Sequence, residues 1–424
     1  MLDLKRIRAE PERVREAIAL KKTKADLDRV LALDERRREL LVTAERLKHE
    51  RNETSEEIGR LKKAGRDASE KVAAMKRAGD EIKSLDARIA EVEADLDRIL
   101  VWIPNVPHES VPKADDASGN VIVREAAAIR EFGFAPKPHW EIAESLKLLD
   151  FERAGKIAGA GFLLFTARGA HLERALIQFM LDHHVRRGYV EVSPPHLVRR
   201  ECLFATGQLP KLEEDMYRLG DDDLFLNPTA EVPITNIYRE EILDGAMLPI
   251  RHVGYCASYR REAGSYGRDT RGMIRVHQFD KVELVKFVRP ETSYEEHETL
   301  LRDSGSVLEA LELPYRVLLL AAGDLSFAGA KCYDLETWAP GEGRWLEVSS
   351  CTNFEDFQAR RAGIRYRPDS GAKAEFVHTL NASGLALPRT FATLLEYHQT
   401  ERGTVRVPDA LVPYLGGVRE LGPP

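Results

Sequence analysis

Apolar side chains recur at seven-residue spacing in the first hundred residues. Leu33, Leu40 and Leu47 share one register, and a second ladder begins after Gly65. The members of that second ladder are Ile82, Leu85, Ile89, Val92, Leu96 and Ile99. Alternating steps of three and four residues place such side chains on one stripe of a helix. The pattern predicts a long helix over residues 26–62 and another after Gly65, paired as an antiparallel coiled-coil hairpin. At about 1.5 Å per residue, the first helix spans roughly 55 Å, so we expect an arm.

The pattern changes sharply over residues 102–139, where five prolines appear. Proline-rich stretches of this kind are typical of loops and domain boundaries. We therefore expect two domains: a helical arm over residues 1–103 and a second domain over residues 104–424.

Beyond this boundary, alternating and β-branched runs predict several strands with few helices between them. The expected helices are residues 172–187 and 388–400, and the expected strands are residues 189–192, 248–260, 276–288, 315–320, 344–350 and 376–380. Strands that follow one another in this way favour an antiparallel sheet over a doubly wound parallel one. The predicted fold class is α+β: an antiparallel sheet with flanking helices, plus the N-terminal coiled-coil arm.

The composition fits this division. None of the 31 aromatic residues precedes Trp102, and Pro11 is the only proline before Pro104, so the first hundred residues lack the means for an ordinary globular core. The longest purely apolar run is Val317–Ala322, far short of the roughly 20 residues of a membrane helix. The chain begins without the apolar core of a signal peptide. Its four cysteines form no Cys-x-x-Cys pair, so we expect a cytoplasmic protein without a disulfide framework or structural zinc.

Charge is also unevenly distributed. The net charge is −7 overall, with +2 over residues 1–100 and −9 over the remainder. Lys62, Lys63, Arg66 and Lys71 cluster where the hairpin turns, and a basic tip is suited to phosphate. A solvated helix surface explains the same charges, and coiled coils commonly serve in dimerisation. Charge alone leaves these alternatives open.

The segment from Tyr259 to Glu283 is the richest in candidate chemistry. Strand-like residues flank a loop with several glycines and arginines, a combination suited to holding a polyanion. Arg260 and Glu262 lie two positions apart, which on one strand places them on the same face. An arginine there can hold a phosphate while the glutamate accepts from an amine; a solvated surface hairpin is the alternative. The glycine motifs of the two common nucleotide-binding folds are absent from the sequence.

Four stretches together resemble the class II aminoacyl-tRNA synthetases, specifically the seryl-tRNA synthetase family. The segment Arg260-Arg-Glu262, followed by Arg275-Val-His-Gln-Phe279 and Lys281-Val-Glu283, is similar to motif 2. The other stretches are Thr206-Gly-Gln-Leu-Pro210 after Pro195 (motif 1), Asn227-Pro-Thr-Ala-Glu231 (serine binding) and Gly384-Leu-Ala-Leu-Pro-Arg389 (motif 3). The resemblance covers the whole chain, because this family also has an N-terminal coiled-coil arm.

The resemblance implies ATP-dependent activation of L-serine and its transfer to tRNA(Ser), and also to tRNA(Sec). It implies ATP as a substrate, Mg²⁺ as the metal, a homodimer built through motif 1, no membrane, and tRNA bound by the arm and the motif 2 loop. The residues implied in catalysis are Arg260, Arg275 and Arg389. Those implied in serine binding are Thr229, Ala230, Glu231, Glu283, Asn381 and Ser383. Those implied in ATP binding are Arg260, Arg261, Glu262, Val276, Phe279, Glu347, Val348, Ser349, Ser350 and Arg389, with Glu347 and Ser350 as metal ligands.

The implied chemistry needs no enzyme nucleophile, because the serine carboxylate attacks the α-phosphorus directly. Catalysis is then positioning plus electrostatic stabilisation of phosphate charge, which the three arginines and the metal can supply. Two alternatives remain: a paralogue that delivers an activated amino acid to a carrier protein, and a catalytically inactive scaffold. The arm argues against the first, and the intact Arg260, Glu262, Glu347 and Arg389 argue against the second.

Overall fold

The computed structural model describes residues 1–263 and 271–423. This part of the chain forms two compact units, Met1–Pro104 and Asn105–Pro424. Gly264 and Gly267 of the predicted polyanion-binding loop lie outside the described residues. None of the described helices combines the length and apolar character needed to cross a bilayer.

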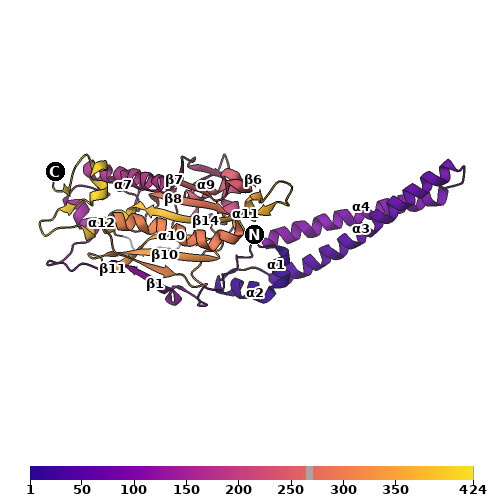
Figure 1. Cartoon of the computed structure of the whole chain (residues 1–424), viewed down its shortest axis with the longest axis horizontal. Coiled ribbons are helices and arrows are strands. Elements are labelled where there is room, and N and C mark those ends of the chain that lie inside the picture. The colour runs from indigo at the N-terminus through magenta and orange to yellow at the C-terminus, as the bar shows by residue number, and fades with distance from the viewer. Residues whose placement is uncertain (264–270, 424) are drawn as a thin grey trace. The chain divides into compact units, whose positions relative to one another are not determined.

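The N-terminal unit is built from helices. These are α1 (Leu4–Ala9), α2 (Pro11–Leu20), α3 (Leu27–Lys63) and α4 (Ser69–Leu100). Asp26 caps α3, because its side chain accepts a hydrogen bond from the Arg29 backbone N–H. Gly65, with φ of +65°, lies in the turn to α4. The predicted helical hairpin is confirmed (Figure 1), whereas α1 and α2 were not expected.

The hairpin is held by the apolar stripe that its sequence predicts. Side chains from both helices form one buried cluster: Leu40, Ala44, Leu47, Ile82, Leu85 and Ile89. Ion pairs join the helices beside it, from Arg37 to Glu93 at 2.7 Å and from Lys48 to Asp86 at 2.9 Å. Solvent-exposed pairs contribute at most about 1 kcal/mol each, so the apolar seam provides most of the stability.

An eight-stranded sheet organises the second unit, in the order β1-β9-β10-β11-β14-β8-β7-β2. Its strands are β1 (Val121–Ala126), β2 (Val190–Val192), β7 (Ile250–Tyr259), β8 (Gln278–Val288), β9 (Tyr315–Leu319), β10 (Lys331–Ala339), β11 (Arg344–Asn353) and β14 (His378–Ala386). Neighbours are antiparallel except β2 and β7. The predicted antiparallel α+β fold is therefore confirmed.

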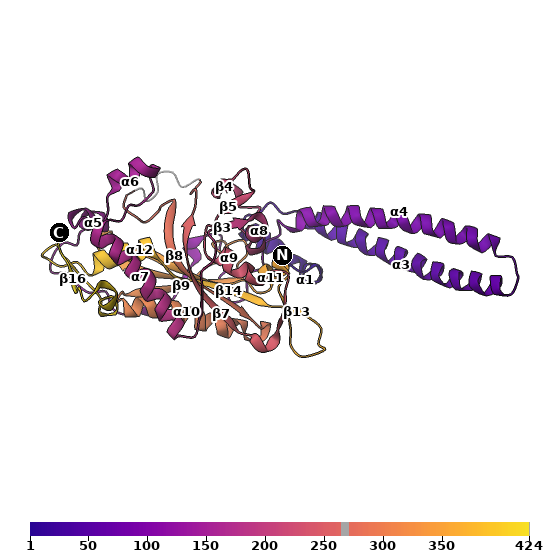
Figure 2. The same cartoon turned by 90° about the horizontal axis from the view of Figure 1, so that it is seen from above.

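Helices and three small sheets surround this sheet (Figure 2). The helices are α5 (His139–Ser145), α6 (Phe151–Ala158), α7 (Ala167–Arg186), α8 (Arg200–Thr206), α9 (Glu231–Thr235), α10 (Ser293–Ala310), α11 (Phe357–Ala362) and α12 (Leu387–Tyr397). The small sheets contain β3 (Leu197–Arg199), β4 (Arg218–Leu219) and β5 (Leu224–Leu226); β6 (Ile242–Asp244), β12 (Arg365–Arg367) and β13 (Glu375–Phe376); and β15 (Val405–Arg406) with β16 (Glu420–Leu421).

Alternate side chains of strand β8 point to opposite faces of the sheet. One face packs against α10, and the other, which we call the functional face, carries a cavity. Lys286 points toward α10, where its Nζ lies 2.9 Å from Glu296. Phe279, Lys281 and Glu283 have the opposite parity along the strand, so they lie on the other face. These three residues line a cavity. The two-residue period of one strand thus directs part of its polar side chains into the site.

Several features differ from the sequence-based expectation. The single strand predicted over residues 376–380 is two strands, β13 in a small sheet and β14 in the main sheet, with Val377 between them. Strand β10 and helix α10 were not predicted, although the residues of β10 alternate between buried and partly exposed positions along most of the strand.

Candidate active site

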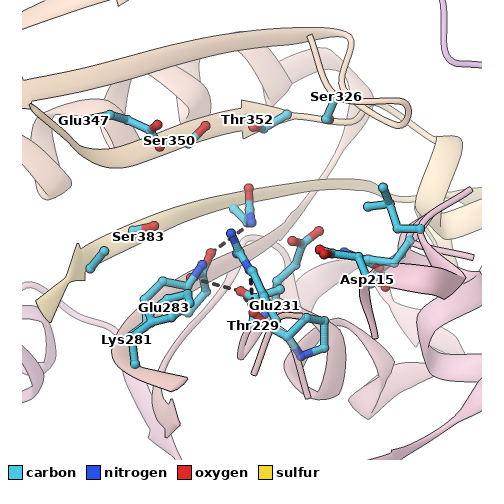
Figure 3. A pocket seen from close by; sticks show the side chains of 18 of the residues that line it. Asp215, Thr229, Glu231, Lys281, Glu283, Ser326, Glu347, Ser350, Thr352 and Ser383 are labelled. Carbon is cyan, nitrogen blue, oxygen red and sulfur yellow. Dashed lines mark hydrogen bonds and ion pairs between the residues drawn. The ribbon is translucent and has the colours of Figure 1, made fainter. Parts of the chain in front are cut away.

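A cavity of about 440 Å³ lies on the functional face of the sheet (Figure 3). Its walls come from β8, β11 and β14, from the segment preceding α9, and from the start of α12. Most residues singled out from the sequence line it: Thr229, Glu231, Arg260, Glu262, Arg275, Val276, Phe279, Glu283, Glu347, Val348, Ser350, Asn381, Ser383 and Arg389. Residues up to 160 positions apart are therefore brought together as one site.

Three of the expected residues do not line the cavity. Ala230 is fully buried at the start of α9. Arg261 is exposed, and its backbone N–H donates to the Asp215 carbonyl at 2.9 Å. The hydroxyl of Ser349 is directed into the protein, where it donates to the Ser383 carbonyl at 2.7 Å. Ser349 therefore supports the cavity wall from behind.

Glu283 is the centre of the polar end of the cavity. Its Oε2 lies 2.7 Å from the Nζ of Lys281, and its Oε1 accepts a hydrogen bond from the Asn381 amide at 2.9 Å. The hydroxyl of Thr229 donates weakly to the same carboxylate, at 3.4 Å. A buried carboxylate is costly unless it is paired and hydrogen-bonded. The lysine and amide satisfy that requirement and fix the orientation of Glu283.

Glu231 lies in the same cavity but has a different environment. Its Oε1 accepts from the Gln358 amide at 2.7 Å, and Gln358 is held in turn by the Thr379 hydroxyl at 2.7 Å. Burial, together with the nearby charge of Glu283, raises the pKa of Glu231 to about 7. A carboxylate in this setting gains strongly from a ligand that brings positive charge, such as an ammonium group.

Three arginines, Arg260, Arg275 and Arg389, also line the cavity. The guanidinium of Arg260 lies 5.1 Å from the ring centre of Phe279 and donates to the Pro228 carbonyl at 3.3 Å. Arg275 donates to Glu262 at 2.5 Å, while its Nε is buried without a hydrogen-bond partner among the described residues. Arginines beside an exposed aromatic face are suited to phosphate and to a purine ring.

The expectation that Arg260 and Glu262 share a strand face is wrong. Strand β7 ends at Tyr259, and Glu262 has a left-handed φ of +52°. The two residues follow the strand as irregular chain. Both nevertheless line the cavity, because the turn there brings Glu262 against Arg275.

Arg389 comes from α12 and borders the same cavity. Its guanidinium donates to the Glu347 backbone carbonyl at 2.8 Å and lies 3.2 Å from the Glu347 carboxylate. Its Nε donates to the Ile274 carbonyl at 3.3 Å. Arg389 is thus tied both to β11 and to the segment before β8, which fixes its position over the cavity.

Glu347 and Ser350 fit the implied magnesium site. Both line the cavity and offer oxygen ligands, which Mg²⁺ prefers. Asp334, opposite Ser350 on the neighbouring strand, has its pKa raised well above the ordinary value by burial and by the charge of Glu347.

Sequence reasoning missed three residues that shape the site: Lys281, Gln358 and Asp334. Lys281 had a signal, because it precedes Glu283 by two positions on a predicted strand and therefore shares its face. Gln358 and Asp334 had none. They reach the site only through tertiary contacts of α11 and β10.

Two family descriptions match the chain. The seryl-tRNA synthetase N-terminal domain matches residues 1–107, and the tRNA synthetase class II core domain (G, H, P, S and T) matches residues 213–398.

Known proteins match it over its full length. The chain is 56% identical to a serine–tRNA ligase of Carboxydothermus hydrogenoformans, covering 98% of each chain. It is 55% identical to that of Pelotomaculum thermopropionicum, covering 100% of each. The crystal structure of seryl-tRNA synthetase from Pyrococcus horikoshii complexed with ATP has a TM-score of 0.94 at 37% identity, covering 100% of each chain. A cytoplasmic serine–tRNA ligase from Naegleria fowleri in complex with AMP has a TM-score of 0.87 at 28% identity, covering 97% of this chain and 96% of that one.

The arm, the antiparallel sheet and a cavity lined by both carboxylates and arginines agree with these matches. The chain belongs to the seryl-tRNA synthetase family of class II aminoacyl-tRNA synthetases.

Proposed function

We propose that the protein activates L-serine with ATP and transfers the seryl group to the 3′ end of tRNA(Ser). The observation that carries this proposal is the polarity of one cavity. It is lined by the guanidinium groups of Arg260, Arg275 and Arg389 and by the buried carboxylates of Glu231 and Glu283. ATP with an α-amino acid presents the complementary charges, phosphates next to an ammonium group.

In the first step, a serine carboxylate oxygen attacks the α-phosphorus of ATP. The new P–O bond forms as the bond to the β-phosphate oxygen breaks, which yields seryl-adenylate and pyrophosphate. Arg260 holds the α-phosphate, while Arg275 and Arg389 stabilise charge on the departing phosphates. Mg²⁺, when held by Glu347 and Ser350, supplies further neutralisation of phosphate charge.

The adenosine part is recognised in the same cavity. Phe279 and Arg389 stack on opposite faces of the adenine, and Glu262 together with the Val276 backbone reads its edge. This role requires Glu262 to exchange its contact with Arg275 for the adenine amino group. Such an exchange also frees the Arg275 guanidinium for phosphate.

Serine is recognised by the two buried carboxylates of the cavity and the polar residues around them. Glu231 accepts from the ammonium group, and Glu283 accepts from the hydroxyl, with Thr229, Asn381 and Ser383 lining the pocket. A site built to bind a hydroxyl rejects an analogue that lacks it by about 10⁴–10⁵-fold, because its polar groups are left unpaired. Alanine fails for this reason, and threonine fails because of its size.

In the second step, a terminal ribose hydroxyl of the tRNA attacks the activated carbonyl carbon and AMP leaves. We assign tRNA binding to the arm over residues 1–103 and to the motif 2 loop, of which residues 264–270 lie outside the described part. The arm is less acidic than the catalytic domain over residues 104–424, which favours contact with phosphate. The same surfaces accept tRNA(Sec) where a cell contains it.

The functional unit is a cytoplasmic homodimer joined through motif 1. Strand β2 supports this assignment, because it ends the eight-stranded sheet and its Val190 side chain is 60% exposed. Strand β2 leads into Pro195 of motif 1, and an edge strand can pair with a strand of a second chain.

One assay panel tests the proposed function. Exchange of pyrophosphate into ATP is measured with each of twenty amino acids, and charging of tRNA(Ser) follows. We expect serine-dependent exchange together with charging. Exchange without charging would instead identify a carrier-protein ligase, and exchange that needs no amino acid would contradict serine activation.

A further inference from the structure

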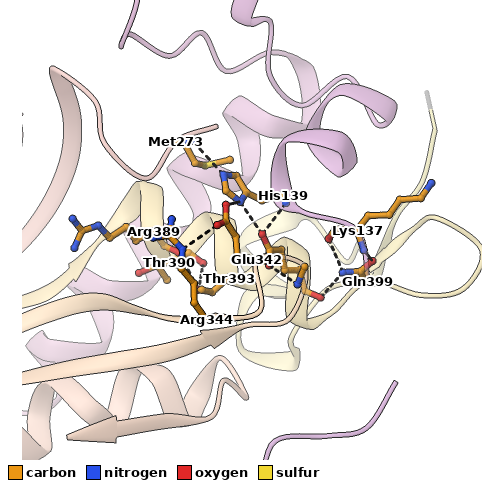
Figure 4. A network of polar contacts seen from close by, with 11 residues as sticks. Lys137, His139, Met273, Glu342, Arg344, Arg389, Thr390, Thr393 and Gln399 are labelled. Carbon is orange, nitrogen blue, oxygen red and sulfur yellow. Dashed lines mark hydrogen bonds and ion pairs between the residues drawn. The ribbon is translucent and has the colours of Figure 1, made fainter. Parts of the chain in front are cut away.

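His139 and Glu396 form a fully buried pair, and Figure 4 shows the network of polar contacts around His139. The His139 Nδ1 lies 2.8 Å from Oε1 of Glu396, and the His139 backbone N–H donates to the same oxygen at 2.8 Å. The other oxygen accepts from the backbone N–H groups of Gly341 and Glu342, at 2.8 and 3.1 Å. The Glu396 carboxylate thus links the first turn of α5 to the turn between β10 and β11 by hydrogen bonds.

The carboxylate determines which ring nitrogen of His139 carries the proton. Because Nδ1 donates to Glu396, the neutral ring presents Nε2 as an acceptor. The Met273 backbone N–H donates to that Nε2 at 3.2 Å. Gly272 permits this approach, since a Cβ there would lie 2.1 Å from Nε2 and its φ is +73°. His139 therefore holds the backbone at the start of the segment Met273–Val276.

Helix α12 makes a second contact with the segment Met273–Val276. Arg389 and Glu396 lie seven positions apart on α12, which is two turns and the same face of the helix. The Arg389 Nε donates to the Ile274 carbonyl at 3.3 Å, next to the N–H of Met273 that His139 holds. The segment continues into Arg275 and Val276, which line the cavity.

We propose that His139, oriented by Glu396, is a positioning residue for ATP binding. It sets the backbone of Met273–Val276 at the spacing that lets Arg275, Val276 and Arg389 engage ATP together. His139 does not line the cavity and acts only through the backbone of Met273. The inference rests on the proposed function, because it assigns the segment to ATP.

The same cluster has the composition of a cation site, since ligand atoms of His139, Glu342 and Glu396 lie within 4.8 Å of one another. The hydrogen bonds argue for a different role. Each oxygen of Glu396 already accepts from two N–H groups, and Nδ1 of His139 carries a proton. Stoichiometric zinc that remained in the purified protein after dialysis against EDTA would overturn the positioning role.

Two substitutions separate the two ring nitrogens. In His139→Asn the amide reaches the place of Nδ1 and can still donate to Glu396, but nothing accepts from Met273. In His139→Gln the longer side chain places a carbonyl oxygen near Nε2. We expect His139→Asn to raise the KM for ATP in pyrophosphate exchange about tenfold, with the KM for serine within about twofold. We expect His139→Gln to recover most of the ATP affinity.

His398→Asn is the matched control. His398 is also buried and lies two residues after Glu396, where it contacts the Leu311 carbonyl and Arg406. We expect its loss to lower the Tm without changing the KM for ATP. A rise in the KM for ATP in this control as large as in His139→Asn would contradict the proposal, as would equal impairment of the Asn and Gln variants of His139 or a joint rise in both KM values.

Calorimetric binding of ATP in the absence of serine separates this inference from the proposed function. A wild-type protein that exchanged no pyrophosphate with serine would refute the proposed function alone. Weaker ATP binding by His139→Asn than by wild type and by His398→Asn would still support the positioning role. Equal ATP binding by all three proteins would refute it.

Discussion

The Nζ of Lys281 lies 2.7 Å from Oε2 of Glu283, two positions later on the same face of β8. One of the two carboxylates that we propose bind serine therefore carries its own counter-ion. The other, Glu231, is hydrogen-bonded to the neutral amide of Gln358. This asymmetry assigns different tasks to the two groups, since Glu231 gains most from an incoming ammonium and Glu283 is held as a hydrogen-bond acceptor.

The first prediction concerns pH. In the free protein the pKa of Glu231 is about 7, so its carboxylate becomes protonated as the pH falls below that value. A protonated Glu231 offers no charge to the serine ammonium. We expect kcat/KM for serine, which reports the free enzyme, to fall about tenfold per pH unit below about pH 7. The Glu231→Gln variant should be much less active and lack this dependence, while a flat wild-type profile between about pH 6 and pH 8 would remove Glu231 from serine binding.

The second prediction concerns Lys281→Met. Without the lysine, the Glu283 carboxylate loses its counter-ion while it remains close to Glu231, so the charge and orientation of the pocket change. We expect the KM for serine to rise at least about tenfold, with a smaller change in the KM for ATP.

Lys286→Met is the control for that variant. Lys286 is a buried lysine on the same strand, but it pairs with Glu296 on the opposite face of the sheet. We expect it to lower the free energy of unfolding by about 3 kcal/mol and to leave the KM for serine unchanged. If both lysine variants altered serine kinetics equally, the counter-ion role of Lys281 would be wrong.

The third prediction concerns magnesium. Replacing Glu347 with Gln removes a charged oxygen ligand, while the Glu347 backbone carbonyl can still accept from Arg389. We expect the Mg²⁺ concentration for half-maximal exchange to rise about tenfold or more. Glu336→Gln is the control, because Glu336 faces Glu347 across β10 and β11 but pairs with Arg316. An unchanged Mg²⁺ requirement in Glu347→Gln would exclude Glu347 as a ligand.

The fourth prediction concerns the arm. Deleting residues 30–98 removes nearly all of the paired helices α3 and α4 and leaves the catalytic unit untouched. We expect pyrophosphate exchange to remain within about threefold of wild type, while kcat/KM for tRNA charging falls by at least about 10³. Exchange in the same variant is the internal control. Charging at the wild-type rate would refute the assignment of the arm to tRNA.

The fifth prediction concerns assembly. We expect a solution mass of twice 47.8 kDa for the wild-type protein. Val190→Asp, on edge strand β2, should yield monomers, because a buried unpaired carboxylate is costly. Val123 is 49% exposed on β1 at the other edge of the sheet and lies far from motif 1 in the sequence, so Val123→Asp should remain dimeric. Light scattering after size exclusion measures both, and a wild-type monomer would refute the dimer.

Local pattern predicted some of these features well and others poorly. The helical hairpin follows from heptads, because contacts between its helices repeat the same short spacing. Most of the predicted site residues line one cavity. They could be named from the sequence because they belong to motifs that the sequence displays intact. The face shared by Arg260 and Glu262 was wrong, since it assumed that β7 continues beyond Tyr259.

Supporting contacts were beyond sequence reasoning for a physical reason. Gln358 meets Glu231 across 127 positions, and His139 meets Glu396 across 257. The sequence around such a glutamine or histidine contains no repeating pattern that identifies its distant partner. Its role arises only when separate elements pack together.

Strand β8 fixes the distance between the residues proposed to contact adenine and serine. Phe279, which we propose contacts adenine, and Glu283, which we propose contacts serine, are four residues apart on one face, a separation of about 13 Å along a strand. The backbone of β8 sets this distance, and hydrogen bonds to β14 on one side and β7 on the other hold the strand in place. A stable mimic of seryl-adenylate that matches this distance would meet a preorganised surface, which favours tight inhibition with little reorganisation. A one-residue insertion between Phe279 and Glu283 would turn Glu283 to the opposite face of the sheet.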